Sequence, residues 1–171
     1  MMTLYLVTGG FGHLGYTVAT QLLEQEKNVL LFDVEEKPYL KNMERLKIAK
    51  GDIRNKDDLE KLFAMTKGKR TFVIHCAGLI SIKTKEDRLV DEVNVTGTAN
   101  IVEFCMKYNV EKLIYVGSVH AIREKPKGTT ITEPSTYYPS QVKGQYARTK
   151  AKATLTVMDS VKKGLKAVVV H

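Results

Sequence analysis

Cysteine and long apolar runs are both scarce in this chain of 171 residues. Its two cysteines, Cys76 and Cys105, are too few for the disulfide framework of a small secreted scaffold. They stand 29 residues apart, which is not the paired spacing of zinc ligands, so we predict no metal site. The longest apolar runs have the length of strands, far short of the roughly 20 residues that a membrane-spanning helix needs.

Basic residues outnumber acidic ones by 27 to 19, which gives a formal net charge of +8. Such an excess can attract nucleic acid or phosphorylated ligands. The basic residues are nevertheless spread over many segments, acidic residues lie among them, and no aromatic stacking motif accompanies them. We therefore predict no nucleic-acid partner, and interpret the charge as a solvated surface that at most favours nucleotide ligands. A basic leader and a small-residue cleavage site are also missing, so we expect a cytoplasmic protein without a membrane partner.

Strand and helix patterns alternate along the whole chain. Apolar runs predict six strands, at 2–8, 29–33, 46–49, 71–75, 113–116 and 165–170. Helical patterns lie between most of them, at 13–26, 56–65, 86–108 and 145–163, and Asn55 is predicted to cap the second of these helices. This alternation predicts an α/β fold: a Rossmann-type, doubly wound parallel sheet of about six strands in the order 3-2-1-4-5-6, with helices on both faces. In the first helix we expect one apolar face, made of Leu14, Val18, Leu22 and Leu23.

In this topology ligands bind at the carboxyl ends of the strands, where the strand order reverses. A glycine-rich segment, Gly9-Gly10-Phe11-Gly12-His13-Leu14-Gly15, follows the first strand there and opens the first helix. It contains Gly10-x-Gly12-x-x-Gly15 and also Gly9-x-x-Gly12-x-x-Gly15. Glycines at this spacing allow a tight turn, a close backbone approach to a pyrophosphate and close helix packing. The free N–H groups of the helix start would favour the same anion. We therefore predict a dinucleotide-binding loop.

Asp33 ends the second strand, 18 residues after Gly15. A carboxylate at this position accepts hydrogen bonds from the adenosine ribose hydroxyls and repels a 2′-phosphate. It therefore favours NAD over NADP as cofactor. Lys37 and Lys41 oppose that preference because either side chain could reach a phosphate, unless both belong to a solvated surface.

A candidate catalytic pair lies on the last predicted helix. Tyr146 and Lys150 are four residues apart, which places both side chains on one helix face. Ser118 follows the fifth strand and should face the same cleft from a strand carboxyl end. Asn94 lies on the preceding long helix.

This combination resembles the extended short-chain dehydrogenase/reductase family, which includes the NAD-dependent epimerases and dehydratases. The matching segments, in the family's order, are Thr8–Gly15, Asp33, Gly51–Ile53, His75–Gly78, Asn94–Asn100, Ser118 and Tyr146–Lys150. Within the family, Tyr115–Ile122 looks most like the dihydroflavonol-reductase-like and hydroxysteroid-dehydrogenase-like branch, many of whose members use NADPH.

The resemblance implies a role for each matching residue. Tyr146 would be the general acid/base, with its ordinary pKa near 10 lowered by the Lys150 ammonium and an oxidised nicotinamide. Lys150 would also bind the nicotinamide ribose, and Ser118 the substrate oxygen. Asn94 would support the site and a proton relay, or else mark a helix kink.

Other matching residues would contact the cofactor alone. Asp52 and Ile53 would lie against the adenine. Cys76, Ala77 and Gly78 would pass close to the ribose and phosphates by their backbone. We interpret Cys76 as a small buried apolar residue without thiol reactivity.

The implied reaction is hydride transfer between a nicotinamide and a secondary alcohol or ketone. A 4,6-dehydratase is disfavoured, because Val119-His120 follows Ser118 where those enzymes carry Asp-Glu. A nucleotide-sugar epimerase remains the alternative, although Ala121-Ile122-Arg123 replaces its usual Val-Tyr-Gly. A non-catalytic NAD(P) sensor is a third possibility, against which the intact Ser118, Tyr146 and Lys150 argue. His120 would face either the substrate or the solvent.

The resemblance also leads to expectations about extent and assembly. We expect residues 1–171 to form one NAD(P)-binding Rossmann domain without the C-terminal substrate lobe of the family, and therefore to be weakly active or inactive alone. The family often dimerises through its two long helices, here 86–108 and 145–163. In them Val90, Val93, Leu155 and Val157 would face a second copy or, alternatively, the sheet.

Overall fold

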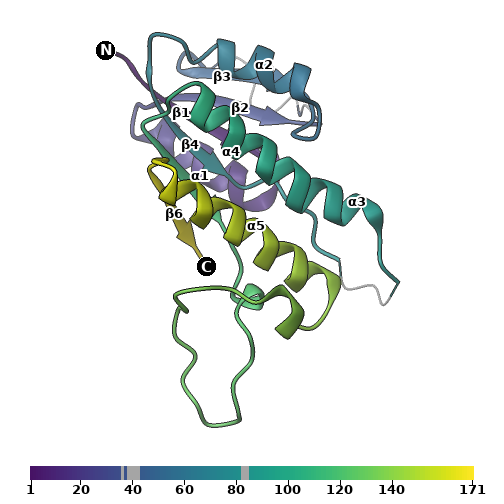
Figure 1. The fold of residues 1–171 in the computed structure, drawn as a ribbon. Coiled ribbons are helices and arrows are strands. Elements are labelled where there is room, and N and C mark those ends of the chain that lie inside the picture. Colours follow the sequence, from purple (N-terminus) through teal and green to yellow (C-terminus); the bar gives the residue numbers. More distant parts are fainter. Residues whose placement is uncertain (36, 38–42, 82–84) are drawn as a thin grey trace.

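The computed structural model describes residues 1–35, 37, 43–81 and 85–171 and shows one parallel sheet (Figure 1). The strands are β1 (Thr3–Thr8), β2 (Asn28–Asp33), β3 (Leu46–Lys50), β4 (Arg70–His75), β5 (Lys112–Val116) and β6 (Ala167–Val170). They lie in the order β3-β2-β1-β4-β5-β6, and every neighbouring pair is parallel. The predicted Rossmann-type sheet and its strand order are therefore confirmed.

The helices of the described residues differ from the prediction mainly at one place. They are α1 (His13–Glu24), α2 (Lys56–Ala64), α3 (Arg88–Asp91), α4 (Thr98–Lys107) and α5 (Gln145–Lys162), with short 3₁₀ turns η3 (Val119–Ala121) and η4 (Pro139–Gln141). The long helix predicted at 86–108 is interrupted by a π-helical segment, η2 (Glu92–Gly97), between α3 and α4. As predicted, the Asn55 side chain caps α2, where it accepts from the Asp57 N–H. No helix in the described part of the chain is long and apolar enough to cross a membrane.

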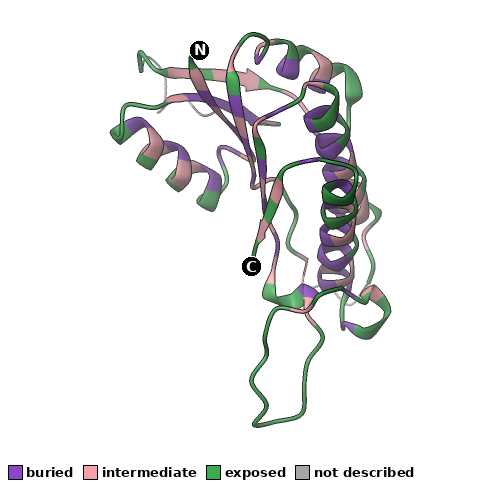
Figure 2. Ribbon diagram, turned by 60° about the vertical axis from the view of Figure 1, so that its left-hand side comes forward, coloured by how far each residue is buried: buried purple, intermediate pink, exposed green. Residues whose placement is uncertain are grey.

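The two faces of the sheet are covered unequally (Figure 2). On one face, α2, α4 and α5 pack over a core that runs from Leu6 on β1 to Leu113 on β5. On the other face, α1 packs against β1 and β2, where Val7 and Leu31 are buried. Beyond α1, the same face is open: Val170 on β6 is 51% exposed.

The two edges of the sheet differ as well. The β3 edge carries Lys47 and Lys50, both exposed, whereas β6 reads Ala-Val-Val-Val and has no charged residue.

Three of the four residues predicted for the apolar face of α1 lie on its packed face: Leu23 is buried, and Val18 and Leu22 are partly buried against the same core. Gly15 and Ala19 are buried as well, while Leu14, the fourth, is 45% exposed. The cause lies in the glycine-rich loop. A Cβ on Gly15 would stand 2.1 Å from the Gly9 carbonyl oxygen, so α1 begins with the Gly15 side pressed against that loop. This contact sets the rotation of the helix more strongly than the burial of Leu14 could.

Candidate cofactor pocket and catalytic site

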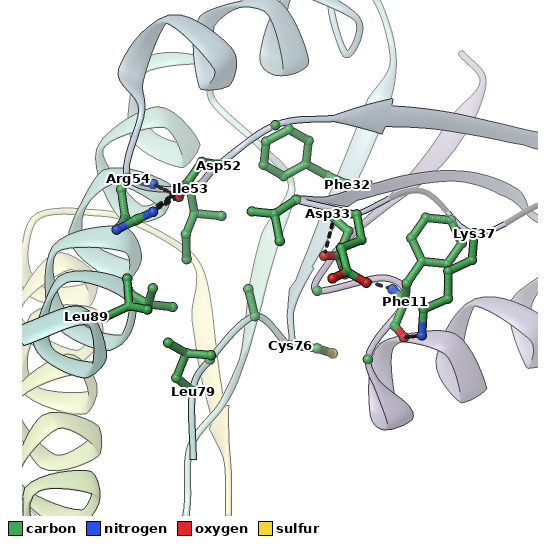
Figure 3. A pocket seen from close by; sticks show the side chains of 18 residues that line it. Phe11, Phe32, Asp33, Lys37, Asp52, Ile53, Arg54, Cys76, Leu79 and Leu89 are labelled. Carbon is green, nitrogen blue, oxygen red and sulfur yellow. Dashed lines mark hydrogen bonds and ion pairs between the residues drawn. The ribbon is translucent and has the colours of Figure 1, made fainter. Parts of the chain in front are cut away.

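A cavity of about 390 Å³ opens at the carboxyl ends of β1 to β4 (Figure 3). Nine residues predicted to bind the cofactor line it: Gly9, Phe11, Gly12, Asp33, Asp52, Ile53, Cys76, Ala77 and Gly78. The other predicted loop residues, Gly10, His13, Leu14 and Gly15, lie outside the lining, as do Tyr146 and Lys150. Further lining residues come from Phe32, Val34, Glu35, Lys37, Gly51, Arg54, Leu79, Leu89 and Val93. The predicted ligand-facing edge of the sheet is thus hollow.

The glycines of the loop have different surroundings. Gly9 has a φ of +68°, and a Cβ there would meet the Ala77 nitrogen at 2.6 Å. Gly12 is more open: its Cβ would have the Gly9 carbonyl oxygen, at 3.2 Å, as its one neighbour among the described residues within 4 Å. Gly12 offers no side-chain cap to α1, and the first turn of that helix contains no acidic residue. The helix start can therefore receive an anion, which fits a pyrophosphate.

Asp33 lies beside the loop and is tied to it (Figure 3). Its Oδ2 accepts from the Phe11 N–H at 2.9 Å, and its Oδ1 accepts from the Glu35 N–H at 3.3 Å. The Lys37 ammonium donates to the Phe11 carbonyl at 3.4 Å. Lys41, the second lysine considered for a phosphate, lies outside the described residues. Asp33 thus has a structural contact besides its predicted contact with the cofactor ribose.

Arg54 closes the opposite side of the pocket, and the sequence prediction did not include it. Its guanidinium pairs with Asp52 at 2.5 Å and with Glu92 of η2 at 3.0 Å. The hydrogen bond from Arg54 holds the pKa of Asp52 below its ordinary value, against the effect of partial burial. The neighbouring Ile53 is buried, and its carbonyl accepts from the Asn100 side chain at 3.0 Å.

Lys150 reaches the end of this pocket from α5. It is 6% exposed, and its ammonium donates to the Val116 carbonyl at 2.7 Å. Burial lowers the pKa of Lys150 to about 8, and the nearby Cys76 thiol opposes this effect. A Cβ on Gly78 would stand 3.9 Å from the Lys150 Nζ. Gly78 therefore joins the cavity lining to the predicted catalytic lysine.

Asn94 is 1% exposed and lies within the π-helical segment. Its Oδ1 accepts from the Leu79 N–H at 2.8 Å. Its Nδ2 donates to the Leu79 carbonyl at 2.9 Å and to the Thr149 hydroxyl at 3.0 Å. Asn94 thus fastens the pocket segment at Leu79 to α5, next to Lys150.

Ser118 and Tyr146 both contact His120 of the 3₁₀ turn η3. The Ser118 Oγ accepts from the His120 N–H at 3.2 Å, and the His120 ring lies edge-on to the Tyr146 ring with centroids 6.2 Å apart. His171, which the sequence prediction did not include, has its Nδ1 3.1 Å from the Ser118 nitrogen and its Nε2 2.5 Å from the Tyr137 hydroxyl. Both Ser118 and Tyr146 therefore neighbour a histidine.

The two cysteines are protonated thiols at neutral pH. Burial raises the pKa of Cys76 to about 11, although the positive charge of Lys150 opposes that rise. Cys105 is fully buried in the core, and burial raises its pKa as well. Neither side chain has the electropositive, exposed surroundings of a reactive thiol.

His75 is a fully buried imidazole behind the pocket. Its Nδ1 lies 2.6 Å from the Thr8 hydroxyl, and its Nε2 lies 3.1 Å from the Thr98 hydroxyl. Burial, together with the positive charge of Lys150, lowers the pKa of His75 to about 3. The ring is therefore held neutral in the folded protein.

Acid is expected to destabilise the chain through His75. Between pH 6.5 and 3 the unfolded chain binds a proton that the folded imidazole refuses, so stability falls as the pH drops through this range. From pH 7 to pH 5 this one group should cost about 2 kcal/mol. Urea unfolding at both pH values measures the loss. The His75→Gln variant, whose amide can bond to both threonines without titrating, should lose about 2 kcal/mol less, and identical losses would contradict the assignment.

Several known proteins are similar to this chain. The chain is 33% identical over 159 residues to the bifunctional UDP-glucose 4-epimerase and UDP-xylose 4-epimerase 1 of Pisum sativum, covering 85% of this chain and 44% of that protein. It is 31% identical over 156 residues to human short-chain dehydrogenase/reductase family 42E member 1, covering 91% of this chain and 39% of that one. The Thermus thermophilus UDP-glucose 4-epimerase, solved with NAD, superposes with a TM-score of 0.84 at 29% identity, covering 97% of this chain and 53% of its own.

This chain thus spans about half, or less, of the length of each of these relatives. Residues 6–168 match the 3-beta hydroxysteroid dehydrogenase/isomerase family. That match extends from β1 into β6 and contains every predicted cofactor-binding and catalytic residue. The predicted resemblance to the extended short-chain dehydrogenases is therefore confirmed, and the chain belongs to the 3-beta hydroxysteroid dehydrogenase/isomerase family.

Proposed function

We propose that this chain is the cofactor-binding and proton-transferring part of an NAD-dependent oxidoreductase that interconverts a secondary alcohol and a ketone. The observation that carries the proposal is the position of Gly78. Its backbone lines the cavity, and a Cβ on it would stand 3.2 Å from the Asn94 amide oxygen and 3.9 Å from the buried Lys150 ammonium. A ligand that fills the cavity would end at Lys150, one helical turn from Tyr146.

In this proposal the residues of the chain divide the work. Gly9–Gly15 and Asp33 hold the pyrophosphate and the adenosine ribose, and Asp52 and Ile53 lie against the adenine. When bound, NAD accepts or returns the hydride. Tyr146 moves the hydroxyl proton, Lys150 binds the nicotinamide ribose and favours the phenolate, and Ser118 binds the substrate oxygen. Residues 1–171 would form one NAD(P)-binding domain, and the remaining length of the relatives would carry most substrate contacts.

A second cavity supports the placement of the substrate. It has a volume of about 1000 Å³ and lies beside η3, where His120 and His171 line it. Its lining also includes Arg123, Lys125 and Lys143, along with Glu124 and Glu133. The basic residues suit an anionic substrate such as a nucleotide sugar, and the apolar residues of the lining suit an uncharged ketone or alcohol.

A nucleotide-sugar 4-epimerase is the second candidate, favoured by the 33% identity to the Pisum sativum epimerase. An epimerase returns the hydride to its substrate, so NADH does not accumulate, whereas a dehydrogenase releases NADH. We would therefore incubate the chain with equimolar NAD and either a 3β-hydroxysteroid or UDP-glucose. Absorbance at 340 nm measures NADH, and chromatography measures the epimer. The equimolar ratio reveals even one slow turnover. NADH without an epimer would exclude the epimerase, and an epimer without NADH would exclude the dehydrogenase.

Cofactor preference is expected to depend on the charge of Asp33. The Asp33→Asn variant keeps an oxygen for the Phe11 N–H but no longer repels a 2′-phosphate. Its affinity for NADPH relative to NADH should rise about tenfold. Calorimetric titration with both cofactors tests this. Asp57→Asn, an exposed change with the same effect on net charge, is the control and should leave the ratio unchanged.

We also propose a homodimer through the helices at 86–108 and 145–163. Val90 and Val157 are buried within the chain itself, so they pack inwards rather than on a second copy. The exposed Met106 on α4 and Met158 on α5 support the proposal as outward-facing apolar contacts. Light scattering that finds only monomers would remove it.

A further inference from the structure

The surroundings of the buried Lys150 ammonium are unusual for a charged group. Among the described residues no carboxylate lies within ion-pair distance of its Nζ, and its hydrogen-bond acceptor there is the Val116 carbonyl. Taking an ammonium out of water without a counter-charge is costly, so other groups must help to stabilise it. The titratable groups around it are Tyr146 on α5, His75 and Cys76 from β4 and its loop, and Tyr115 on β5.

Tyr115 stands out among these neighbours. The Lys150 Nζ lies over its ring, 4.6 Å from the ring centroid, within the range of a cation–π interaction. The ring is fully buried and packs beside the His75 ring, with ring centroids 5.7 Å apart. The Tyr115 hydroxyl is buried near the Thr98 side chain and makes no hydrogen bond of ordinary geometry within the described part of the chain. The contact of Tyr115 with Lys150 is therefore made by the ring face and not by the hydroxyl.

We propose that Tyr115 is a positioning residue, whose ring face keeps the Lys150 ammonium charged and fixed at the end of the cofactor pocket. The aromatic face supplies the negative potential that a carboxylate would otherwise provide. A carboxylate here would bind the ammonium strongly and compete with a cofactor hydroxyl for its protons. The ring leaves the N–H groups that do not point at Val116 available. The consequence for catalysis rests on the proposed function, but the effect on Lys150 does not.

The test changes the ring electrostatics while keeping its shape. Tyr115→Phe removes the hydroxyl alone, and the same position then receives 4-fluoro-, 3,4,5-trifluoro- and pentafluorophenylalanine. Lysine labelled with ¹³C at Cε reports the pKa of Lys150 by NMR titration, and loss of the signal in Lys150→Met assigns it. We expect the wild type and Tyr115→Phe to share a pKa near 8. Across the fluorinated series it should fall by about one unit, because a weaker ring face disfavours the charged form.

A constant pKa across the fluorinated series would overturn the proposal and reduce Tyr115 to a space-filling residue. NADH affinity, measured on the same proteins at pH 7, separates this result from the proposed function. If both the pKa and the affinity fall together, Tyr115 positions Lys150 for the cofactor. If the pKa falls while affinity stays constant, Tyr115 still holds the charge of Lys150, and it is the role of Lys150 in cofactor binding that fails.

Discussion

Replacing Tyr146 with phenylalanine is expected to lower turnover by about 100- to 10,000-fold, the usual contribution of a positioned general acid or base. The change removes one hydroxyl and leaves the ring beside His120 in place. Lys150, one turn away, keeps its bond to the Val116 carbonyl. NADH affinity should therefore stay within about twofold of the wild type, since no cofactor contact is removed apart from the phenol itself.

Product formation under equimolar conditions and calorimetric NADH titration are the two measurements. Tyr138→Phe is the matched control, because Tyr138 is half exposed on the loop before η4 and should lose its hydroxyl without effect. A Tyr146→Phe protein as active as the control would exclude Tyr146 as the proton-transferring group. If neither protein turns over and both bind NADH equally well, the result would favour the NAD(P) sensor.

The second large effect is expected in the glycine loop. Gly12→Ala should weaken NADH binding by about 100-fold, which corresponds to one or two lost charge-assisted hydrogen bonds to the pyrophosphate. Gly12 has φ −71° and ψ 165°, which alanine adopts without strain, and its Cβ would stand 3.2 Å from the Gly9 carbonyl oxygen, a tight contact that a shift of a few tenths of an ångström relieves. The free energy of unfolding should therefore hardly change, although the new methyl group would occupy the open side of the loop.

Gly15→Ala provides the contrast. Its Cβ would stand 2.1 Å from the Gly9 carbonyl oxygen, so the loop and α1 would have to move apart. We expect Gly15→Ala to lose stability and binding together, and Gly12→Ala to lose binding alone. Urea unfolding with calorimetry distinguishes the two outcomes. If Gly12→Ala binds NADH normally, the pyrophosphate does not approach the chain at this loop.

The residues that the sequence revealed are those whose physical signal is local. The glycine spacing, Asp33 at the end of β2 and the Asn55 cap each act within a few residues, and each lies where the pattern predicted. Burial of Leu14 was predicted wrongly, because periodicity carries no information about the Gly9 carbonyl that turns α1. Asn94, predicted either to support the site or to mark a helix kink, lies in the interrupting segment η2, but no hydrophobic pattern records its bond with Leu79.

Other parts of the site arise from long-range contacts. The clamp of Arg54 on Glu92 joins residues 38 positions apart, and His171 approaches Ser118 across 53 positions. Charged and imidazole side chains at such positions look like ordinary surface residues in a sequence. His75, by contrast, lies inside a strand pattern, so its burial can be read from the sequence. Its contacts with Thr8 and Thr98 cannot, because they form only when β1, β4 and α4 come together.

The two edges of the sheet differ in how readily they can pair with a further strand. At β3, a strand arriving from outside would have to place its side chains among Lys47 and Lys50, and bare ammonium groups resist burial by a new neighbour. At β6 the incoming strand would lie beside valines and could pair with the backbone N–H and C=O groups of the exposed edge. The sheet can therefore be extended at β6 and is protected at β3. An additional strand would pair with β6, on the side of the sheet that carries Ser118 and the second cavity rather than the side that carries Asp33.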